Sequence, residues 1–466
     1  MAFIGREEEL SFLEEKYRSK KGELVILYGR RRIGKTETLR RFCGGKRHIF
    51  HSCTETTDRN QLDILGNRIL AEHPTASRYL SRFEDWETAF RSAAEIPGRE
   101  KKLLIIDEFP YMVRGNRSIP SILQNLWDLE LKNRNVMIVL CGSAMSFIEK
   151  EVLAEKNPLY GRATGILKML PMDFYDAVRF FPRKPPAELV TLYSILGGVP
   201  YYLSQFDPAA SIEKNICGRI LRRGEVLYNE IEFLVRQELR EPALYNSIIE
   251  AVALGNTRLN EIHQKTQIDK NKLAVYLKNL VEIGLVQREI PVSESPKEKA
   301  NVQRGLYRID DSFFRFWYAF VFPNLSELEY GDPKSVYRHL VKPRLDWFVS
   351  HTFEDVCRSY LRRLNRANRL PFYFTRIGRW WNKTAEIDVM ATDVHQKNLL
   401  LGECKFRSVP MTPADFEKLR AKYRPDNEIK VHYSLFSKSG FTPALKRIAA
   451  QENVALVDLH KIVKPF

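Results

Sequence analysis

The sequence predicts a multidomain α/β protein, on the basis of its length and of two stretches in which strand and helix patterns alternate. The chain has 466 residues, of which 44% are hydrophobic and 28% charged, and such a length corresponds to about two to four domains. Short β-rich runs alternate with polar helical stretches over residues 1–165, which is typical of a parallel sheet with crossover helices. The same mixture returns over residues 336–466. This composition excludes a fibrous or wholly disordered chain.

Changes in the predicted secondary structure along the chain indicate the domain boundaries. The middle of the chain is mostly helical, with prolines and a Gly-Gly-Val-Pro turn near residue 200. A group of three short helices and two strand-like runs around a polar hairpin follows it. We expect an α/β core over 1–165, a helical region over 166–240, the three-helix group over 241–310, a connecting helix over 311–335 and a second α/β domain over 336–466.

The positive charge is concentrated near the end of the chain. The net charge is +16, and residues 341–466 contain 23 Lys and Arg against 13 Asp and Glu. A basic excess of this kind favours a polyanionic partner such as DNA, because phosphate binding releases counterions. The alternative is a solvated face that only keeps the protein in solution.

Hydropathy and cysteine content further restrict the class of protein to which the chain can belong. No run approaches the eighteen apolar residues of a membrane helix, and the beginning of the chain lacks the pattern of a signal peptide. The six cysteines never approach CxxC spacing, which argues against a zinc ribbon or a disulfide framework. We therefore expect a cytoplasmic protein without a membrane partner.

A strand-like run over residues 23–28 leads directly into a phosphate-binding motif. The pattern G-x-x-x-x-G-K-[ST] is matched in full, and a helical stretch follows it. Backbone N–H groups of such a loop surround phosphates, the lysine reaches the β- and γ-phosphates, and the threonine hydroxyl binds Mg²⁺. The sequence therefore predicts that ATP and Mg²⁺ are bound by Gly29, Arg30, Arg31, Arg32, Ile33, Gly34, Lys35 and Thr36.

Two further strand-like runs end in polar residues suited to the same site. The run over 103–107 ends in Asp107, followed by Glu108. Asp107 is expected to hold the Mg²⁺ shell, and Glu108 to orient and deprotonate the attacking water. The run over 136–141 is followed by Gly-Ser, so Ser143 is either a sensor of the γ-phosphate or a simple turn residue.

With these motifs the chain resembles the archaeal-type AAA+/STAND P-loop ATPases. The resemblance implies an ATPase core over 1–165 and a helical lid over 166–240. It also implies that Arg162 completes a nucleotide site, within the chain or across subunits. Ser143 stands where AAA+ motors commonly have Asn, which favours a switch over a processive motor. The resemblance rests on residues 3–10, the phosphate loop, Asp107-Glu108, residues 141–143, 158–162 and 197–200.

The three-helix group with its two strand-like runs resembles a winged helix-turn-helix. In that fold the third helix can enter the major groove of DNA. The polar face of this helix would present Lys270, Asn271, Lys272 and Lys278, which suit phosphates and base edges. The alternative is an interdomain adaptor without DNA contact.

Two strand-like runs in the last domain carry charged residues between apolar ones. Glu386 and Asp388 share one face of the first run, and Glu403 and Lys405 share one face of the second, because side chains alternate along a strand. Neighbouring carboxylates are the oxygen ligands that Mg²⁺ prefers, and a lysine beside them can position water or stabilise developing charge. The alternative is a surface meander with solvated charges, since E-x-K pairs recur elsewhere in this chain.

This arrangement resembles the PD-(D/E)xK nuclease fold, a restriction-endonuclease-like α/β domain. By that resemblance Asp388, Glu403 and Lys405 form the core motif and are implied as catalytic, and Glu354, on a preceding helix, is implied as an additional acid. The metal ligands implied here are Glu354, Asp388 and Glu403. At the separate ATP site, the motifs described above predict Glu108 as catalytic and Thr36 and Asp107 as metal ligands.

The leading hypothesis is an ATP-hydrolysing protein whose nucleotide state controls a Mg²⁺-dependent, nuclease-like DNA-binding domain. One alternative is an ATP-gated DNA-binding regulator without nuclease turnover. Another is a STAND-type signalling switch that forms homo-oligomers on binding ATP.

Overall fold

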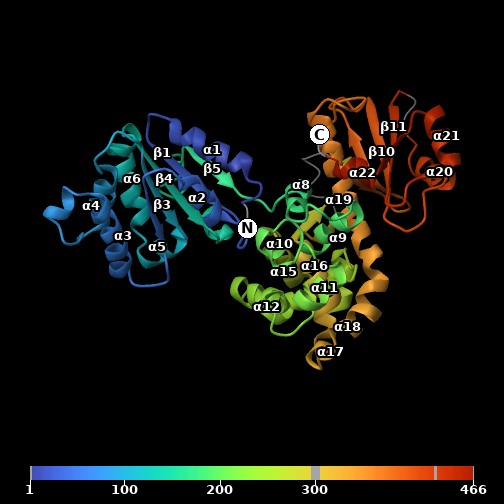
Figure 1. Ribbon diagram of the computed structural model, residues 1–466, viewed down its shortest axis with the longest axis horizontal. Coiled ribbons are helices and arrows are strands. Elements are labelled where there is room, and N and C mark those ends of the chain that lie inside the picture. The colour runs from blue at the N-terminus through green and yellow to red at the C-terminus, as the bar shows by residue number, and fades with distance from the viewer. Residues whose placement is uncertain (1–2, 295–304, 425–427, 465–466) are drawn as a thin grey trace. The chain divides into compact units, whose positions relative to one another are not determined.

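The computed structural model of the chain describes residues 3–294, 305–424 and 428–464 (Figure 1). The polar hairpin expected between the two strands of the three-helix group lies largely outside the described residues. The chain divides into two compact units. The first comprises the residues up to Met172 together with 199–201, and the second comprises 173–198 and the residues from Tyr202 onward. Among the described residues, no helix is long and apolar enough to cross a membrane.

A five-stranded parallel sheet forms the centre of the first unit, in the order β2-β3-β4-β1-β5. Every residue of β1 and β4 is buried, because helices cover both faces. The strands predicted over 23–28, 103–107 and 136–141 are confirmed as β1, β3 and β4. The strands are β1 (Glu23–Tyr28), β2 (His48–Ser52), β3 (Lys102–Asp107), β4 (Val136–Gly142) and β5 (Gly165–Lys168).

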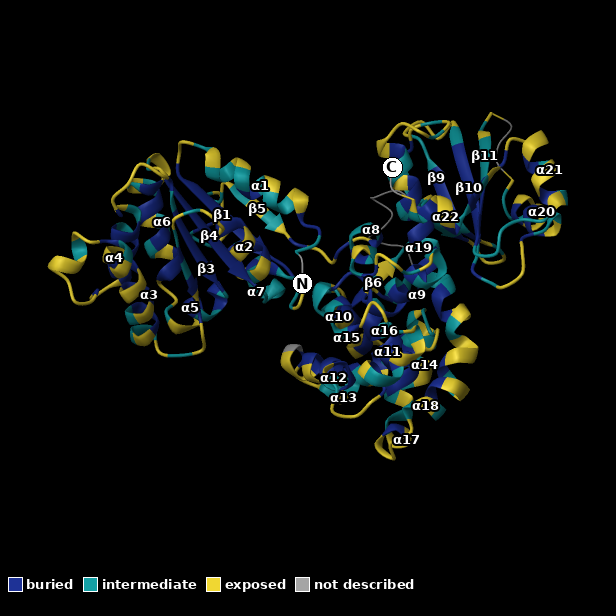
Figure 2. Ribbon diagram, viewed as in Figure 1, coloured by how far each residue is buried: buried dark blue, intermediate teal, exposed yellow. Residues whose placement is uncertain are grey.

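Two apolar clusters, one on each face of this sheet, form the core of the first unit. Figure 2 shows the buried strands between helices whose outer faces are exposed. These helices are α1 (Glu7–Arg18), α2 (Lys35–Cys43), α3 (Asp58–Glu72), α4 (Trp86–Ala94), α5 (Phe109–Gly115), α6 (Ile119–Leu129) and α7 (Met145–Phe147).

The strand β5 lies at the boundary expected near residue 165, and it belongs to the core sheet. It pairs in parallel with β1, Val25 standing opposite Gly165. Only every second residue of β5 is partly buried, as expected of a strand at the edge of a sheet. Its sequence therefore lacks the continuous apolar run that marked the central strands, and the first compact unit continues to Met172.

The second unit begins with helices and a small antiparallel sheet. The predicted order of helix, helix, longer helix and two strands is confirmed by α13, α14, α15, β6 and β7. The sheet pairs β6 (Val286–Glu289) with β7 (Leu306–Ile309). The longer helices of this region are α9 (Pro186–Leu196), α12 (Val226–Glu238), α13 (Pro242–Ala253), α14 (Leu259–Thr266) and α15 (Lys270–Glu282). The shorter ones are α8 (Phe174–Ala177), α10 (Pro200–Gln205), α11 (Ile212–Asn215), α16 (Ser312–Phe316), α17 (Leu325–Glu329) and α18 (Pro333–Val336).

The end of the chain folds around a five-stranded mixed sheet in the order β12-β11-β10-β9-β8. The strands β8, β9 and β10 pair antiparallel, whereas β10, β11 and β12 pair in parallel. The strands are β8 (Arg376–Trp381), β9 (Glu386–Thr392), β10 (Asn398–Lys405), β11 (Lys430–Ser437) and β12 (Ala455–Asp458). The helices are α19 (Leu345–Arg366), which contacts β9 and β10, α20 (Pro413–Lys422), α21 (Pro443–Gln451) and α22 (Leu459–Val463).

Candidate functional site

The phosphate-binding motif forms a tight loop between β1 and α2. Gly29 must be glycine, because a Cβ at this position would lie 2.4 Å from the carbonyl oxygen of Met169. Gly34 is the N-cap of α2 and has a left-handed conformation, with φ of 86°. Arg32 is also left-handed, with φ of 70°, and Ile33 is fully buried. The loop is thus held against the sheet, with the N-terminus of α2 behind it.

The two polar side chains at the start of α2 already meet other polar groups. The Lys35 ammonium donates a hydrogen bond to the carbonyl oxygen of Arg30 at 3.0 Å. Burial lowers the pKa of Lys35. The Thr36 hydroxyl donates to Oδ2 of Asp107 at 2.7 Å. The pairing of a threonine hydroxyl with a buried carboxylate gives two oxygen atoms of the kind that bind Mg²⁺.

Asp107, Glu108 and Ser143 come together at the carboxyl ends of β3 and β4. Oε2 of Glu108 accepts hydrogen bonds from the Ser143 hydroxyl at 2.8 Å and from its backbone N–H at 3.2 Å. The backbone N–H of Glu108 donates to Oδ1 of Asp107 at 3.1 Å. Glu108 itself is left-handed, with φ of 53°, a conformation that costs energy in a residue with a side chain. The three polar residues therefore form one contiguous group beside the phosphate loop.

Two residues that are distant from the phosphate loop in the sequence, Arg6 and Tyr201, contact it. Arg6 is buried and donates hydrogen bonds to the carbonyl oxygens of Ile33, at 2.8 Å, and Leu170, at 2.7 Å. The guanidinium of Arg32 lies 4.1 Å from the ring centre of Tyr201. Tyr201 belongs to the short segment 199–201 that packs with the first unit. Because Arg32 is exposed, a pair of this kind contributes roughly 0.5–1 kcal/mol.

Arg162 lies away from the phosphate loop of its own chain. It precedes β5, and the backbone N–H of Thr164 already pairs with Leu24 at the opposite end of β1 from the loop. A strand of six residues spans roughly 17–20 Å, which is beyond the reach of one side chain. Arg162 instead forms an ion pair with Asp128 at 2.7 Å. The prediction that Arg162 binds a nucleotide is therefore corrected for the chain's own site, whereas contact with the nucleotide of another copy stays a prediction.

Asp388 and Glu403 are brought together by the antiparallel pairing of β9 and β10, as the alternation of side chains predicted. Val389 stands opposite Gly402, and Oδ2 of Asp388 accepts a hydrogen bond from the backbone N–H of Cys404 at 2.8 Å. Burial and the nearby Glu403 carboxylate raise the pKa of Asp388. A cation bound between two such carboxylates would offset their mutual repulsion.

Two lysines neutralise Glu403. Oε1 accepts from the Lys405 ammonium at 2.5 Å, and Oε2 accepts from the Lys422 ammonium at 2.6 Å. Burial would lower the pKa of Lys405, but Glu403 raises it overall. Lys422, at the end of α20, was missed from the sequence, because no local pattern connects that helix with β10.

Glu354 does not complete a set of three carboxylates. Over residues 3–294, 305–424 and 428–464, no group of three or more His, Cys, Asp and Glu side chains is arranged to hold a metal ion. Glu354 lies instead 3.4 Å from Nε of Arg379 and 3.8 Å from Nη1 of Arg358. Metal binding by Glu354 together with Asp388 and Glu403 therefore stays a prediction, although burial and the nearby Asp388 carboxylate raise the pKa of Glu354 to about 8. Asp388 and Glu403 supply oxygen ligands, while two arginines hold Glu354 on α19.

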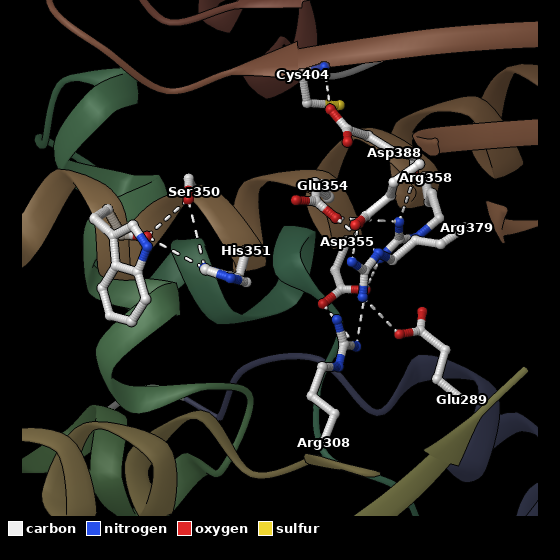
Figure 3. A network of polar contacts seen from close by, with 12 residues as sticks. Glu289, Arg308, Ser350, His351, Glu354, Asp355, Arg358, Arg379, Asp388 and Cys404 are labelled. Carbon is white, nitrogen blue, oxygen red and sulfur yellow. Dashed lines mark hydrogen bonds and ion pairs between the residues drawn. The ribbon is translucent and has the colours of Figure 1, made fainter. Parts of the chain in front are cut away.

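A network of ion pairs connects this region with the small sheet β6–β7. Figure 3 shows contacts from Arg308 through Asp355 and Arg358 to Asp388. Arg308 and Asp355 lie 3.0 Å apart, and Asp355 and Arg358 lie 2.5 Å apart. Arg358 donates to the carbonyl oxygen of Asp388 at 2.6 Å. Burial would raise the pKa of Asp355, but Arg308 and Arg358 hold it well below its usual range.

Arg379 forms a second branch of the same network. Its guanidinium pairs with Glu289 of β6 at 2.9 Å and with Glu386 of β9, in addition to Glu354. No local pattern in the sequence marks Arg379, because its partners lie up to 90 residues away in the chain. The small sheet is thus coupled to the residues around Asp388.

The polar face of α15 is open to solvent. Asp269 is the N-cap of this helix and accepts hydrogen bonds from the backbone N–H groups of Asn271 and Lys272. The buried face consists of Leu273, Leu277 and Leu280. The predicted DNA-contact residues are all exposed: Lys270, Asn271, Lys272 and Lys278.

Comparison with known proteins places the chain in a family. Residues 3–206 match the family described as "ATPase domain predominantly from Archaea", and residues 317–419 match "Archaea bacterial proteins of unknown function". The chain is 36% identical over 409 residues to the uncharacterized protein MJECL04 of Methanocaldococcus jannaschii, covering 87% of this chain and 88% of that protein. The chain belongs to this family of archaeal-type P-loop ATPases.

Two further similarities are to an ATP-binding protein and to a solved ATPase structure. The chain is 51% identical over 45 residues to the uncharacterized ATP-binding protein MJ0423 of M. jannaschii, covering 10% of this chain and 76% of that protein. The solved structure of the Walker-type ATPase PABY2304 of Pyrococcus abyssi has a TM-score of 0.50 and 22% identity, covering 68% of this chain and 96% of that one. This likeness shows the fold of a P-loop ATPase.

Proposed function

We propose that this ATPase couples its nucleotide state to a Mg²⁺-dependent, DNA-cleaving site in the C-terminal sheet. The observation that carries the proposal is the pair formed by half-buried Asp388 and buried Glu403, with Lys405 beside it. The positive charge concentrated in the last quarter of the chain supports DNA as the polyanion.

The phosphate loop would perform ATP hydrolysis through the groups gathered at the ends of β3 and β4. The residues fit ATP with Mg²⁺, because Thr36 and Asp107 present adjacent oxygen atoms and Lys35 lies at the loop. When bound, Mg²⁺ neutralises charge on the transferred phosphate. Glu108 would orient the attacking water and accept its proton, while Ser143 holds the Glu108 carboxylate in place.

The C-terminal site would cleave a phosphodiester with residues of β9 and β10. Asp388 and Glu403 fit a hard cation, because both are carboxylates with buried surroundings. When bound, Mg²⁺ lowers the pKa of water and neutralises charge on the reacting phosphate. Lys405, released from Glu403 by the cation, would stabilise the developing negative charge. Glu354 would bind the cation only after its ion pairs with Arg379 and Arg358 are broken.

The DNA-contact role of α15 and the domain boundaries belong to the same proposal. We place an ATPase core over 1–165, extended by β5, a helical lid over 166–240, a winged helix over 241–310 and a nuclease-like domain over 336–466. The segment 311–335 connects the last two. It is not the single helix expected, because a turn at Gly331, with φ of 92°, separates α17 from α18.

Incubation of the purified protein with linear, circular and single-stranded DNA tests the proposal. Reactions contain Mg²⁺ or Mn²⁺, with and without ATP. The variants Asp388→Ala and Lys405→Ala should lose cleavage while retaining ATP hydrolysis. Lys430→Ala is a matched control, because Lys430 belongs to another E-x-K pair and is exposed at the start of β11. Equal cleavage by Lys405→Ala and Lys430→Ala would remove the assignment.

A second candidate is an ATP-gated DNA-binding regulator without turnover. It is favoured by the ion pairs that Glu403 forms with Lys405 and Lys422 and that Glu354 forms with Arg379. This candidate predicts DNA affinity that responds to ATP and falls steeply with salt, but no strand breaks with either cation. A signalling switch without DNA would instead show an ATP-dependent change in light scattering with DNA absent.

A further inference from the structure

A cavity of about 540 Å³ lies in the second unit beside the network of Figure 3. Its lining comes from the start of α14, the strand β7, the helices α16 and α19 and the turn between β8 and β9. Its volume falls in the range of ligand sites, roughly 300–1,000 Å³. The residues that matter to the argument are Arg258, Tyr307, Arg315, Trp347, His351 and Lys383.

Arg315 lies at this cavity without a carboxylate partner among the described residues. Its Nη2 donates to the carbonyl oxygen of Phe348 at 3.1 Å and to the Thr352 hydroxyl at 2.6 Å. Its guanidinium lies 4.1 Å from the ring centre of Phe348. Burial lowers the pKa of Arg315 to about 10. Arg315 is half-buried and both of its hydrogen-bond acceptors are neutral, so an anion in the cavity would offset the cost of removing this charge from water.

Further cations and aromatic rings line the same cavity. Lys383 lies in the turn between β8 and β9 and is exposed, as is Arg258. The indole of Trp347 is 49% exposed and packs edge-on against His351, with ring centres 5.3 Å apart. Burial lowers the pKa of His351 to about 4, so its ring is neutral near pH 7. Cations beside an exposed aromatic ring are the features that bind phosphates and stack bases.

The acidic residues of the lining are largely neutralised. Glu289 and Glu386 both pair with Arg379, and Glu261 lies 3.9 Å from Arg258. Arg379 also contacts Glu354, so the cavity adjoins the proposed cleavage site. A phosphate in the cavity would therefore lie beside Arg315 and Lys383, which both line it.

We propose that this cavity holds a short stretch of single-stranded DNA, with phosphates on Arg315 and Lys383 and a base against Trp347. The cavity volume of about 540 Å³ is enough for about one nucleotide but too small for a double helix. The proposal deepens the proposed function and rests on it, because it names a single strand as the substrate presented to Asp388 and Glu403.

Fluorescence anisotropy of a labelled thymidine oligonucleotide tests the proposal. The full-length protein is measured in EDTA without ATP, so that no strand is cut. Lys383→Glu and Trp347→Ala should each weaken binding by on the order of tenfold. Lys383→Glu should also reduce the slope of log affinity against log salt by about 0.7 or more, one phosphate contact. Arg315 is left intact, because it also packs on Phe348.

Two substitutions far from the cavity serve as matched controls. Lys397→Glu changes an exposed lysine in the turn at the other end of β9, and Tyr373→Ala removes a ring that is 64% exposed after α19. Both should bind the oligonucleotide like the unchanged protein. Equal affinity of Lys383→Glu and Lys397→Glu, together with equal affinity of Trp347→Ala and Tyr373→Ala, would overturn the proposal.

Two competitors distinguish the sources of the phosphate. A blunt duplex of the same sequence length should compete weakly, and AMP should not compete. Displacement by AMP would overturn the proposal in favour of a mononucleotide site, and equal competition by duplex would overturn it in favour of a double-strand surface. Because binding is scored in EDTA, loss of affinity in the two cavity variants supports the site even when no DNA is cleaved. Cleavage with unchanged affinity would refute the site alone.

Discussion

The two candidate Mg²⁺ sites of this chain are built in different ways. In the first unit, the carboxyl ends of parallel strands meet at one edge, and Asp107, Glu108 and the phosphate loop gather there with short hydrogen bonds. In the C-terminal sheet, Asp388 and Glu403 come from antiparallel strands. Lys422 of α20 pairs with Glu403, and Arg379 of β8 pairs with Glu354. The first site, called the prepared site below, has its polar groups already arranged for a ligand. In the second, called the closed site, a metal ion would have to displace the lysine and arginine side chains that pair with the carboxylates.

This difference suggests where control can act. A prepared site responds to its ligand directly. A site closed by ion pairs opens when a ligand or a neighbouring element displaces them. The small sheet β6–β7 supplies Glu289 and Arg308 to the network, so movement of that sheet would change the pairing of Glu354 and Asp355. The comparison between a prepared and a closed site leads to the following predictions.

The largest effect is expected for Glu108→Gln, which removes the proposed base of the prepared site. ATP binding should persist, because the loop and Lys35 are unchanged. Hydrolysis should fall about 10²–10⁴-fold, the usual contribution of a positioned base. Single-turnover hydrolysis and nucleotide binding are measured on the same preparation. Hydrolysis at the unchanged rate would assign the base elsewhere.

Lys35→Ala should reduce ATP turnover about 10²–10³-fold by removing one charged donor to the phosphates. Lys20→Ala is the matched control, because Lys20 is an exposed lysine of the same unit that follows α1. The steady-state release of phosphate at saturating ATP distinguishes the two. Equal rates of ATP turnover in Lys35→Ala and Lys20→Ala would contradict a role of Lys35 in binding the phosphates.

In the closed site, Asp388→Asn should change the pH dependence of stability. Because the folded pKa of Asp388 is raised above its unfolded value near 4, the folded chain binds more protons there, and its stability falls as the pH rises toward neutrality. The variant should therefore melt a few degrees higher than the unchanged protein at pH 7.5 in EDTA, but not at pH 4.

Asp393→Asn should behave in the opposite way and provides the control. The Asn398 side chain lowers the pKa of Asp393 by hydrogen bonding, so its contribution to stability is present near neutral pH and is lost as the pH falls below about 4. Thermal melts across this pH range test both signs. A parallel response of the two variants would contradict the electrostatic description of the acidic pair.

The smallest effect is expected from Mg²⁺ alone. Without nucleotide, the cation should raise the melting temperature of the unchanged protein by about a degree or two through Asp388 and Glu403. The Asp388→Asn variant should not respond. An equal shift in both proteins would locate the cation elsewhere.

How much the sequence predicted depends on how local each site is. The phosphate loop is one contiguous motif, and strand alternation was enough to predict the contact between Asp388 and Glu403. Lys422 and the partners of Arg379 could not be predicted, because they meet these residues only through the packing of α20, α19 and β6. Arg162 was placed with the nucleotide by resemblance, while its position before β5 puts it at the opposite end of β1.

Control of DNA cleavage by the nucleotide state is tested most directly by comparing cleavage with and without ATP in the unchanged protein and in Lys35→Ala. Our account predicts that ATP changes the cleavage rate of the unchanged protein, and that the Lys35→Ala rate does not respond to ATP. An equal response in both proteins, or no response in either, would contradict coupling between the two sites.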